Sequence, residues 1–134
     1  SSIFNQKEII EYANKVMKEY DVRPSSPNLL TSNFSGGNQQ KIILSRELNE
    51  NPKVLLVGQP TRGVDIGAIE FIHQRLIDMR NKGAAILVAS VELDEVLSLS
   101  DRIIVMFDGK IVGEKKNKNV TDRELGLLMA GVTE

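Results

Sequence analysis

Apolar side chains recur every three or four positions between residues 5 and 20, and charged or amide side chains fill the rest. This period predicts an amphipathic helix over residues 5–20. Its apolar stripe consists of Ile9, Ala13, Val16 and Tyr20, with Ile10 and Met17 beside it. Asn5 stands three positions before Glu8, which predicts a capping box at the start of this helix.

A region rich in helix breakers follows. Residues 21–34 hold two prolines and several serines and asparagines, which predicts a connector. Residues 35–49 begin with Ser-Gly-Gly and contain no further breaker. This pattern predicts a second helix that starts directly after a glycine turn.

Three short apolar runs come next, at residues 54–57, 84–89 and 103–107. None of them alternates strictly, so we expect each strand to be buried on both faces, as in a parallel sheet. Helices are predicted between them, at 66–81 and 92–99. The apolar stripe of the first of these helices consists of Ile69, Ile72, Leu76 and Met79. Strands that alternate with helices predict an α/β layered core with right-handed crossovers.

The end of the chain carries two strong local signals. Asp-Gly at 108–109 separates the third apolar run from residues 110–113, which predicts a β-hairpin. Thr121 and Glu124 have the spacing of a capping box. They predict a last helix that ends near Gly131.

Composition narrows the possible functions. Among 134 residues, 17 Lys and Arg face 18 Asp and Glu, for a net charge of −1, so the charge footprint of nucleic-acid binding is absent. No cysteine is present, which excludes a disulfide framework, a thiolate zinc site and a cysteine nucleophile. One histidine cannot supply a histidine-rich metal cluster. No apolar stretch approaches the roughly 20 residues that span a bilayer.

The segment Ser35-Gly36-Gly37 is the first candidate for chemistry. Glycines let backbone N–H groups approach a ligand closely, and the N-terminus of a helix favours an anion. The serine adds a hydroxyl donor, so this segment could form half of a phosphate cradle. The alternative is a plain helix start after a flexible turn.

Four segments in order resemble the nucleotide-binding domain of ABC transporters. SGGNQQK at 35–41 resembles the signature motif, and PTRGVDIGA at 60–68 resembles the region after the Walker B strand, including the D-loop. LSLSDRIIVMFDGKIVG at 97–113 resembles the stretch that follows the switch position. ELGLLMAG at 124–131 resembles the ending of the nucleoside and simple-sugar branch. The resemblance extends from Phe4 to Gly131.

The resemblance implies a fold class and its parts. The expected fold is α/β, a partial P-loop NTPase (ABC ATPase) core with a mostly parallel sheet, flanking helices, part of the helical subdomain, and a C-terminal hairpin and helix. Residues 1–50 would form the helical subdomain piece with the signature, 51–116 the core from Walker B to beyond the switch, and 117–134 a C-terminal tail.

The family's phosphate loop, GxxxxGK(S/T), does not occur in this sequence. The family places that loop upstream, so we expect the C-terminal part of one truncated domain. Its strand would lie between the strands of residues 84–89 and 103–107. Without it, we expect the exposed strand edges to pair with another copy or close on each other, with lowered stability.

Three positions depart from the family's catalytic pattern. Gly58 stands at the Walker B aspartate, Gln59 at the catalytic glutamate and Val91 at the switch histidine. Glycine offers no ligand for Mg²⁺, glutamine cannot accept a proton at neutral pH, and valine has no polar atom. His73 lies mid-helix beside the apolar stripe and does not substitute. We therefore expect a degenerate hydrolytic site.

The signature, in contrast, is intact. In ABC dimers each signature faces ATP on the other domain, so the resemblance assigns Ser35, Gly36 and Gly37 to ATP bound by the partner. Asp65, at the D-loop position, would reach across the same interface, and it could equally cap the helix at 66–81. No individual role is predicted for Gln39, Gln40 or Lys41.

The implied protein is an ATP-binding subunit of an importer for simple sugars or nucleosides, in which this chain is part of the second, degenerate domain of a tandem subunit. ATP and Mg²⁺ would serve the intact transporter, whereas this chain alone would be inactive and bind neither tightly. Its partners would be a second nucleotide-binding domain, transmembrane permease subunits and, indirectly, a solute-binding protein. It would lie at the cytoplasmic face of the cell membrane and bind no nucleic acid.

Three alternatives stay open. The chain could be a non-catalytic regulatory or docking module on the membrane subunits, which need not dimerise on ATP. It could be the C-terminal lobe of an SMC- or Rad50-type DNA-repair ATPase, although residues 5–20 offer too few heptads for the long coiled coil of that class. It could also be an unrelated small α/β binding protein.

Overall fold

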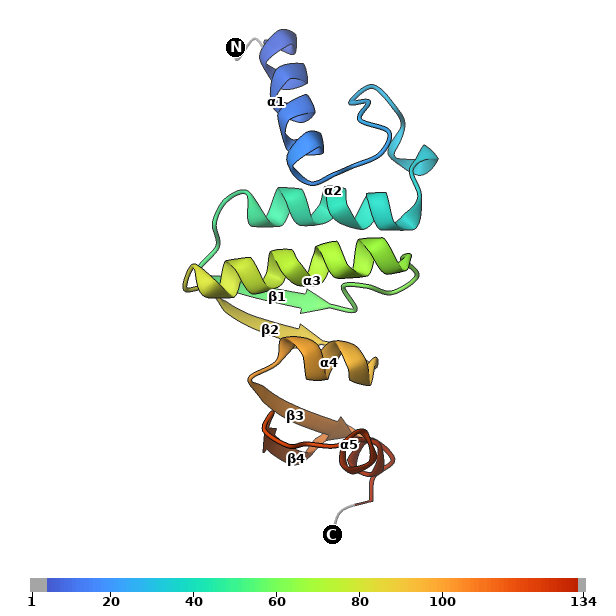
Figure 1. The fold of residues 1–134 in the computed structure, drawn as a ribbon, viewed down its shortest axis with the longest axis vertical. Coiled ribbons are helices and arrows are strands. Elements are labelled where there is room, and N and C mark those ends of the chain that lie inside the picture. The colour runs from blue at the N-terminus through green and yellow to red at the C-terminus, as the bar shows by residue number, and fades with distance from the viewer. Residues whose placement is uncertain (1–4, 133–134) are drawn as a thin grey trace. The chain divides into compact units, whose positions relative to one another are not determined.

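The computed structural model describes residues 5–132, which contain five α-helices, a short 3-10 helix and four strands (Figure 1). In chain order these are α1 (Gln6–Glu19), η1 (Thr31–Asn33), α2 (Gly36–Leu48), β1 (Val54–Gly58), α3 (Ile66–Asn81), β2 (Ala85–Ala89), α4 (Leu93–Leu99), β3 (Arg102–Phe107), β4 (Lys110–Lys116) and α5 (Asp122–Met129). Every helix and strand predicted from the pattern is present. Phe4, where the family resemblance starts, lies outside the described residues. The described helices include none long and apolar enough to cross a membrane.

The strands form two separate ladders. β1 pairs with β2, and the two arrows point the same way in Figure 1, whereas β3 pairs with β4 in antiparallel fashion. β2 and β3 share no ladder. The α/β class is therefore confirmed, and so is the expected break between the second and third strands. The expectation that these edges could close on each other is wrong for this chain. Each edge strand keeps one partner within the described residues.

The chain divides into two compact units. The first contains residues up to 56 and residues 60–87, and the second contains residues 57–59 and the chain from 88 onward. The strands β1 and β2 contribute to both, because their first residues belong to the first unit and their ends to the second. The division at 50 and 116 predicted from the sequence stays a prediction.

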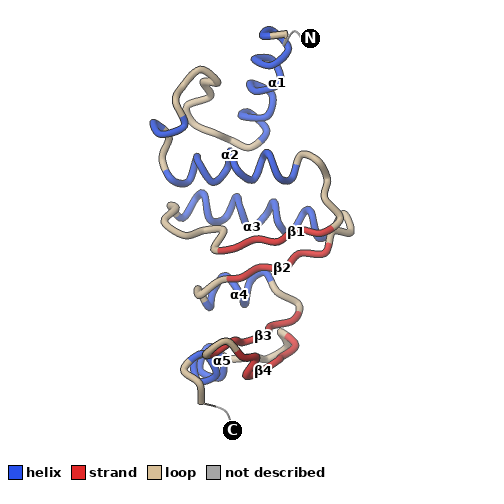
Figure 2. Tube along the Cα trace, turned by 180° about the vertical axis from the view of Figure 1, so that it is seen from behind, coloured by secondary structure: helices blue, strands red, loops and turns tan. Residues whose placement is uncertain are grey.

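Two packed helices form the centre of the first unit. Helices α2 and α3 lie side by side in both views, with β1 next to α3 (Figures 1 and 2). Three members of the predicted stripe of α3, Ile72, Leu76 and Met79, are buried, and Ile69 is partly buried; Ile72 is 0% exposed. The buried apolar residues from these three elements are Leu44, Leu48, Leu55, Ala68, Ile72, Leu76 and Met79.

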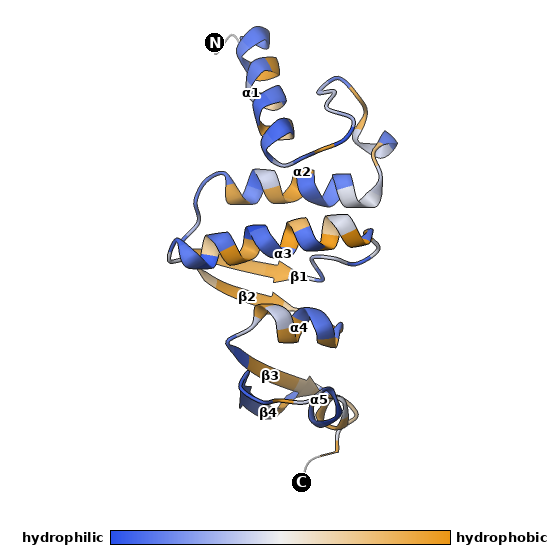
Figure 3. Ribbon diagram, viewed as in Figure 1, coloured by the Kyte–Doolittle hydropathy of each residue, from blue (hydrophilic) through white to orange (hydrophobic). Residues whose placement is uncertain are grey.

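Helix α1 differs from its predicted burial. Asn5 caps it, since its side chain accepts hydrogen bonds from the amides of Lys7 and Glu8, but among the described contacts no bond from the Asn5 amide to the Glu8 side chain completes the predicted capping box. The stripe, however, is buried only near its end: Tyr20 is 4% exposed and Met17 is 8% exposed, whereas Ile9 is 49% exposed. Polar residues dominate this helix, and in the described part no element covers its first half (Figure 3). Amphipathic spacing predicted the helix correctly, but not what packs against it.

The parallel ladder also differs from its prediction. Its strands are apolar along their length (Figure 3), yet alternate residues are exposed. Leu55 is buried, whereas Val54, Leu56 and Leu87 are each more than 60% exposed. The expectation of burial on both faces is wrong for the described residues, because the side chains of one face of this ladder are exposed.

The second unit is built on the hairpin. Asp108 and Gly109 have φ values of 47° and 72°, which fit the tight turn that an Asp-Gly pair favours between antiparallel strands. Phe107 pairs with Lys110 across this turn. The predicted hairpin is confirmed, with its second strand extended to residue 116.

Helix α5 covers the hairpin. Ile103 and Val105 of β3 and Leu125 of α5 form its buried core, and apolar residues of α4 pack against them. The capping box at Thr121 and Glu124 is present in full. Since each box member satisfies a backbone donor of the other, the start of α5 is fixed where the sequence predicts it.

Candidate functional site

Helix α2 begins at the Ser-Gly-Gly segment. Ser35 is its N-cap, and the Ser35 hydroxyl accepts from the Asn38 amide at 3.4 Å and from the Asn38 side chain at 2.9 Å. Ser35 and Gly36 are exposed. The first turn of α2 therefore presents backbone N–H groups and the positive end of the helix dipole at the surface.

The two glycines have a packing role that the sequence did not reveal. A Cβ added to the buried Gly37 would lie 2.9 Å from the Ala68 Cβ and 2.9 Å from an Asp65 carboxylate oxygen. A Cβ on Gly36 would lie 3.2 Å from the Gly63 carbonyl oxygen. The glycines thus let the start of α2 contact the loop that precedes α3.

That loop is held on both sides. Pro60 and Thr61 are buried, and Gln40 on α2 donates a hydrogen bond to the Pro60 carbonyl at 3.0 Å. At its other end Asp65 caps α3, accepting from the Ala68 amide at 3.0 Å. The capping alternative for Asp65 is therefore confirmed, and its D-loop role stays a prediction.

Residues 38–41 connect α2 to the segments before it. The Asn38 side-chain oxygen accepts from the Arg23 amide at 2.8 Å, and Gln39 donates to the Phe34 carbonyl at 2.9 Å. Sequence reasoning assigned these side chains no role. The only local signal was their amide character at the start of a helix, because their partners are set by the tertiary fold.

Lys41 joins the connector to both packed helices. It is 8% exposed, and its ammonium contacts the Asp21 carbonyl at 3.0 Å, the Asp21 carboxylate at 3.4 Å and the face of the Phe71 ring. Arg23 contacts the same carboxylate at 2.8 Å. The Arg23 hydrogen bond, followed by that of Lys41, lowers the pKa of the Asp21 carboxyl below its ordinary value.

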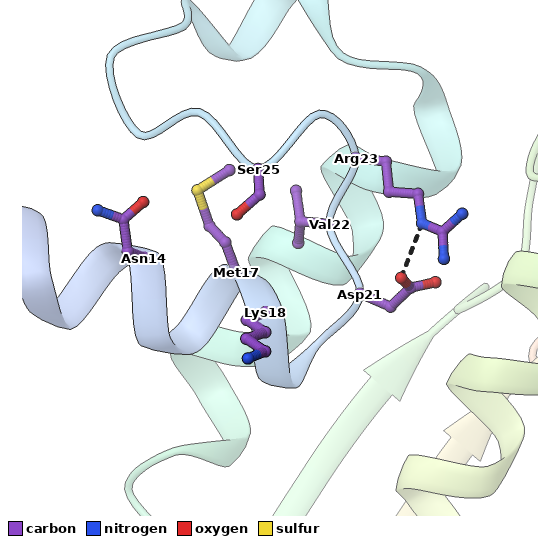
Figure 4. A pocket seen from close by; sticks show the side chains of 7 residues that line it. All are labelled: Asn14, Met17, Lys18, Asp21, Val22, Arg23 and Ser25. Atoms are coloured by element: carbon purple, nitrogen blue, oxygen red, sulfur yellow. Dashed lines mark hydrogen bonds and ion pairs between the residues drawn. The ribbon is translucent and has the colours of Figure 1, made fainter.

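The Asp21–Arg23 pair stands beside an open pocket (Figure 4). Its other lining residues come from the end of α1 and the start of the connector: Asn14, Met17, Lys18, Val22 and Ser25. Asp21 and Arg23 bind each other, so among the lining residues Lys18 is the cation that makes no ion pair with the described part of the chain. No ligand chemistry follows from this alone.

The three positions that differ from the family's catalytic pattern lie at the ends of strands. Gly58 is the last residue of β1, Gln59 follows it, and Val91 follows β2. The Gln59 amide donates to the Ala89 carbonyl at 2.8 Å, which brings these two strand ends together. In α/β sheets ligands bind at the carboxyl ends of the strands, so the three positions lie at the edge where this fold class places its ligand sites.

Their side chains do not fit a metal ion. Gly58 has no ligand atom, and Val91 is 62% exposed without a polar atom. The described residues contain no group of three His, Cys, Asp or Glu that could hold a metal. The residues at this edge therefore do not fit Mg²⁺, and no metal-dependent step follows from them. His73 is partly buried in the middle of α3.

The backbone at Gln59 is unusual. Five non-glycine residues of the described chain have positive φ, and four of them are Asp or Asn, which tolerate this conformation. The fifth is Gln59, with φ 49°. Nothing blocks a side chain at Gly58, since a Cβ there would meet no atom within 4 Å. The glycine at 58 is thus not required by packing.

No family model matches the sequence. Curated relatives do. The chain is 52% identical over 123 residues to a nucleoside import ATP-binding protein of Lactococcus lactis, covering 92% of this chain and 24% of the relative. It is 46% identical to a guanosine import ATP-binding protein of Bacillus subtilis, and the match covers 98% of this chain and 26% of that relative. A ribose import ATP-binding protein of Caldanaerobacter subterraneus is 40% identical, and the match covers 88% of this chain and 24% of that relative. The chain spans about a quarter of the length of these relatives.

Solved structures agree with the sequence relatives. A dimeric ATP-binding cassette bound to ADP and Pi in a post-hydrolysis state matches with a TM-score of 0.72 at 26% identity, covering 89% of this chain and 51% of that one. A dimeric bacterial ABC transporter cassette also matches, with a TM-score of 0.72 at 26% identity. This match covers 90% of this chain and 52% of that one. The order of motifs, the fold and these structures lead to one conclusion: the chain belongs to the ABC ATPase cassettes, and the curated relatives that it matches are sugar and nucleoside import ATP-binding proteins.

Proposed function

We propose that this chain is part of the ATP-binding subunit of an ABC importer for simple sugars or nucleosides, and that ATP hydrolysis in that subunit drives uptake. The observation that carries the proposal is the exposed first turn of α2 at Ser35 and Gly36, within a sequence 52% identical to a nucleoside import ATP-binding protein. The chain covers only 24% of that relative, so the activity belongs to the larger assembly.

The first turn of α2 would act on ATP held by a second nucleotide-binding domain. Exposed N–H groups at a helix N-terminus and a neighbouring hydroxyl suit a phosphate group. Ser35 and Gly36 supply these donors, while Gly37 keeps the turn close to the loop at 60–65. Asp65 would face the same interface.

This chain's own hydrolytic site would be degenerate. At positions 58, 59 and 91 the chain has Gly, Gln and Val, so it lacks a carboxylate for Mg²⁺, a general base and a polar switch group. A positioned general base is worth roughly 10²–10⁴ in rate. The assembly would then have two unlike ATP sites: this chain's own silent site, and the partner's site, which the first turn of α2 completes. Such an asymmetric ATPase would fit a tandem subunit in which this chain belongs to the second domain. ATP and Mg²⁺ would serve that assembly, and the chain alone would bind neither tightly.

The partners would follow from this role. A second nucleotide-binding domain would supply the ATP that Ser35 faces, and transmembrane permease subunits would carry the solute. A solute-binding protein would interact with the permease rather than with this chain. The subunit would therefore lie at the cytoplasmic face of the membrane.

Two substitutions at Ser35 separate ligand contact from helix capping. Aspartate caps a helix about as well as serine, whereas alanine loses about 1 kcal/mol of capping. A carboxylate at this position would repel the phosphates of ATP. In the assembled importer we expect Ser35→Asp to reduce ATP hydrolysis by about 10²-fold or more, and Ser35→Ala to reduce it less.

Thermal unfolding and ATPase rate should be measured on the same preparations. Ser35→Asp should unfold at a higher temperature than Ser35→Ala, whereas Ser35→Ala should hydrolyse ATP faster than Ser35→Asp. Thr121→Asp, a matched change at the N-cap of α5, should leave hydrolysis unchanged. If Ser35→Asp hydrolyses ATP at the normal rate, the ligand role is wrong, and a docking module becomes the better reading.

The degenerate site makes a separate prediction. Gln59→Ala removes a side chain at this edge that could orient water, but the proposal assigns hydrolysis to the other site. We expect Gln59→Ala to leave the ATPase rate of the assembled importer within about twofold, whereas removal of a working general base costs roughly 10²–10⁴. A large loss of hydrolysis in Gln59→Ala would contradict the asymmetric arrangement.

A further inference from the structure

The loop between β1 and α3 makes a tight turn with Arg62 at its tip. The Val64 amide donates to the Thr61 carbonyl at 3.3 Å, so residues 61–64 form a turn with Arg62 and Gly63 as its central pair. Gly63 has φ 72°, the conformation that glycine favours at the second central position. The turn therefore sets where the Arg62 side chain starts.

This turn is fixed beside the first turn of α2. The Gly63 carbonyl lies 3.2 Å from the Cβ position of Gly36, and Gln40 donates to the carbonyl of Pro60. Thr61 is only 8% exposed. Since the residues on either side of Arg62 are anchored to α2, its backbone cannot move far from Ser35 and Gly36.

The guanidinium of Arg62 makes no hydrogen bond or ion pair with the residues that the structure describes, and Arg62 is exposed. The nearest acidic group along the loop, Asp65, already caps α3. Two other arginines of this unit contact protein groups: Arg23 binds Asp21 and Arg75 binds the Glu19 carbonyl. Arg62 thus places an uncommitted cation next to an exposed helix N-terminus.

We infer that Arg62 is a further binding residue for ATP, and that its guanidinium contacts the phosphates of the nucleotide held by the partner domain at the first turn of α2. This inference rests on the proposed function and adds one residue to it. A guanidinium can bind two phosphate oxygens at once and stays charged at every physiological pH. No bond forms or breaks at Arg62; the residue adds positive charge beside the N–H groups of α2.

The test compares three variants in the assembled importer. Hydrogen bonds to charged groups are worth about 1.5–3 kcal/mol, so Arg62→Gln should raise the KM for Mg–ATP by roughly 10- to 100-fold. Arg62→Lys keeps the positive charge but loses the planar guanidinium that can bind two oxygens. Its KM for Mg–ATP should lie between those of the unmodified protein and Arg62→Gln. Arg46→Gln removes an exposed arginine from the last turn of α2, far from its first turn, and is the matched control. It should leave the KM unchanged.

Salt provides a readout that a structural role would not move. The KM of the unmodified protein should rise with ionic strength more steeply than that of Arg62→Gln, because one exposed charge contact is missing in the variant. Both proteins should unfold at the same temperature. An unchanged KM in Arg62→Gln overturns the inference, and so does a loss of subunit assembly with normal KM in the complex that remains, since Arg62 would then bind a protein.

The Ser35 variants distinguish this failure from failure of the proposed function. If Ser35→Asp loses hydrolysis while Arg62→Gln keeps a normal KM, only the inference about Arg62 is wrong. If Ser35→Asp is fully active and Arg62→Gln is also normal, both are wrong. If Arg62→Gln alone raises the KM, Arg62 binds ATP and the role of Ser35 must be revised.

Discussion

Gly37→Ala is expected to lower the free energy of unfolding by about 1–3 kcal/mol, even though alanine is the better helix former. The added methyl group would stand 2.9 Å from both the Ala68 Cβ and the Asp65 carboxylate. The Ala68 Cβ is fixed to the backbone, and the Asp65 carboxylate is held by its hydrogen bond from the Ala68 amide. Helix α2 or the start of α3 would therefore have to shift, and the contact between the first turn of α2 and the loop at 60–65 would loosen.

Gly67→Ala is the matched control in the same unit. Gly67 lies in the first turn of α3, and its added Cβ would be 3.5 Å from an Asp65 oxygen, an ordinary contact. This change should stabilise the chain by roughly 0.5–1 kcal/mol through helix propensity. Urea unfolding followed by circular dichroism measures both. Equal stability of the two variants would show that Gly37 is not tightly packed.

This pair of variants bears on the meaning of the glycines at 36 and 37. Sequence reasoning explained them by close approach of a ligand to the backbone. The structure gives Gly37 a second reason, its contact with Asp65 and Ala68, while Gly36 remains exposed. Loss of activity in a Gly37 variant would therefore not by itself show contact with ATP, which is why the ligand role is tested at Ser35.

Local patterns predicted the elements well. The period of the apolar residues gave α3 the bounds 66–81 that the structure has, and Asp-Gly at 108–109 gave the hairpin. The capping signals at Asn5 and Thr121, and the Ser-Gly-Gly turn at 35–37, mark true helix starts. These signals work because the backbone donors of a first turn must be satisfied within a few residues of the sequence.

Burial and long-range contacts could not be predicted in the same way. Periodicity shows that Ile9 and Leu56 lie on an apolar face, but it does not show whether another element covers that face. The partner of Lys41, Asp21, and that of Gln40, Pro60, are each twenty positions away along the chain. Only the packing of α2 on its neighbouring segments creates these pairs. The roles of residues 58, 59, 65 and 91 in ATP hydrolysis stay predictions.

Ile72→Ala should have the largest effect on the stability of the first unit. Ile72 is 0% exposed in the middle of α3, within the apolar stripe that packs between α2 and β1. Truncation of a buried isoleucine to alanine removes its transfer free energy and leaves a cavity, at a cost of about 2–5 kcal/mol. Because α3 also carries the loop at 60–65, a weakened stripe should reduce the order of that loop.

Ile66→Ala makes the same chemical change in the same helix with the opposite environment. Ile66 is 77% exposed at the start of α3, so its truncation should change stability by less than about 0.5 kcal/mol. The difference between the two variants in the urea midpoint, at equal slope, isolates the contribution of burial. If Ile72→Ala cost no more than Ile66→Ala, the stripe would not be a packed core. The placement of the loop beside α2 would then rest on hydrogen bonds alone, chiefly that from Gln40 to the Pro60 carbonyl.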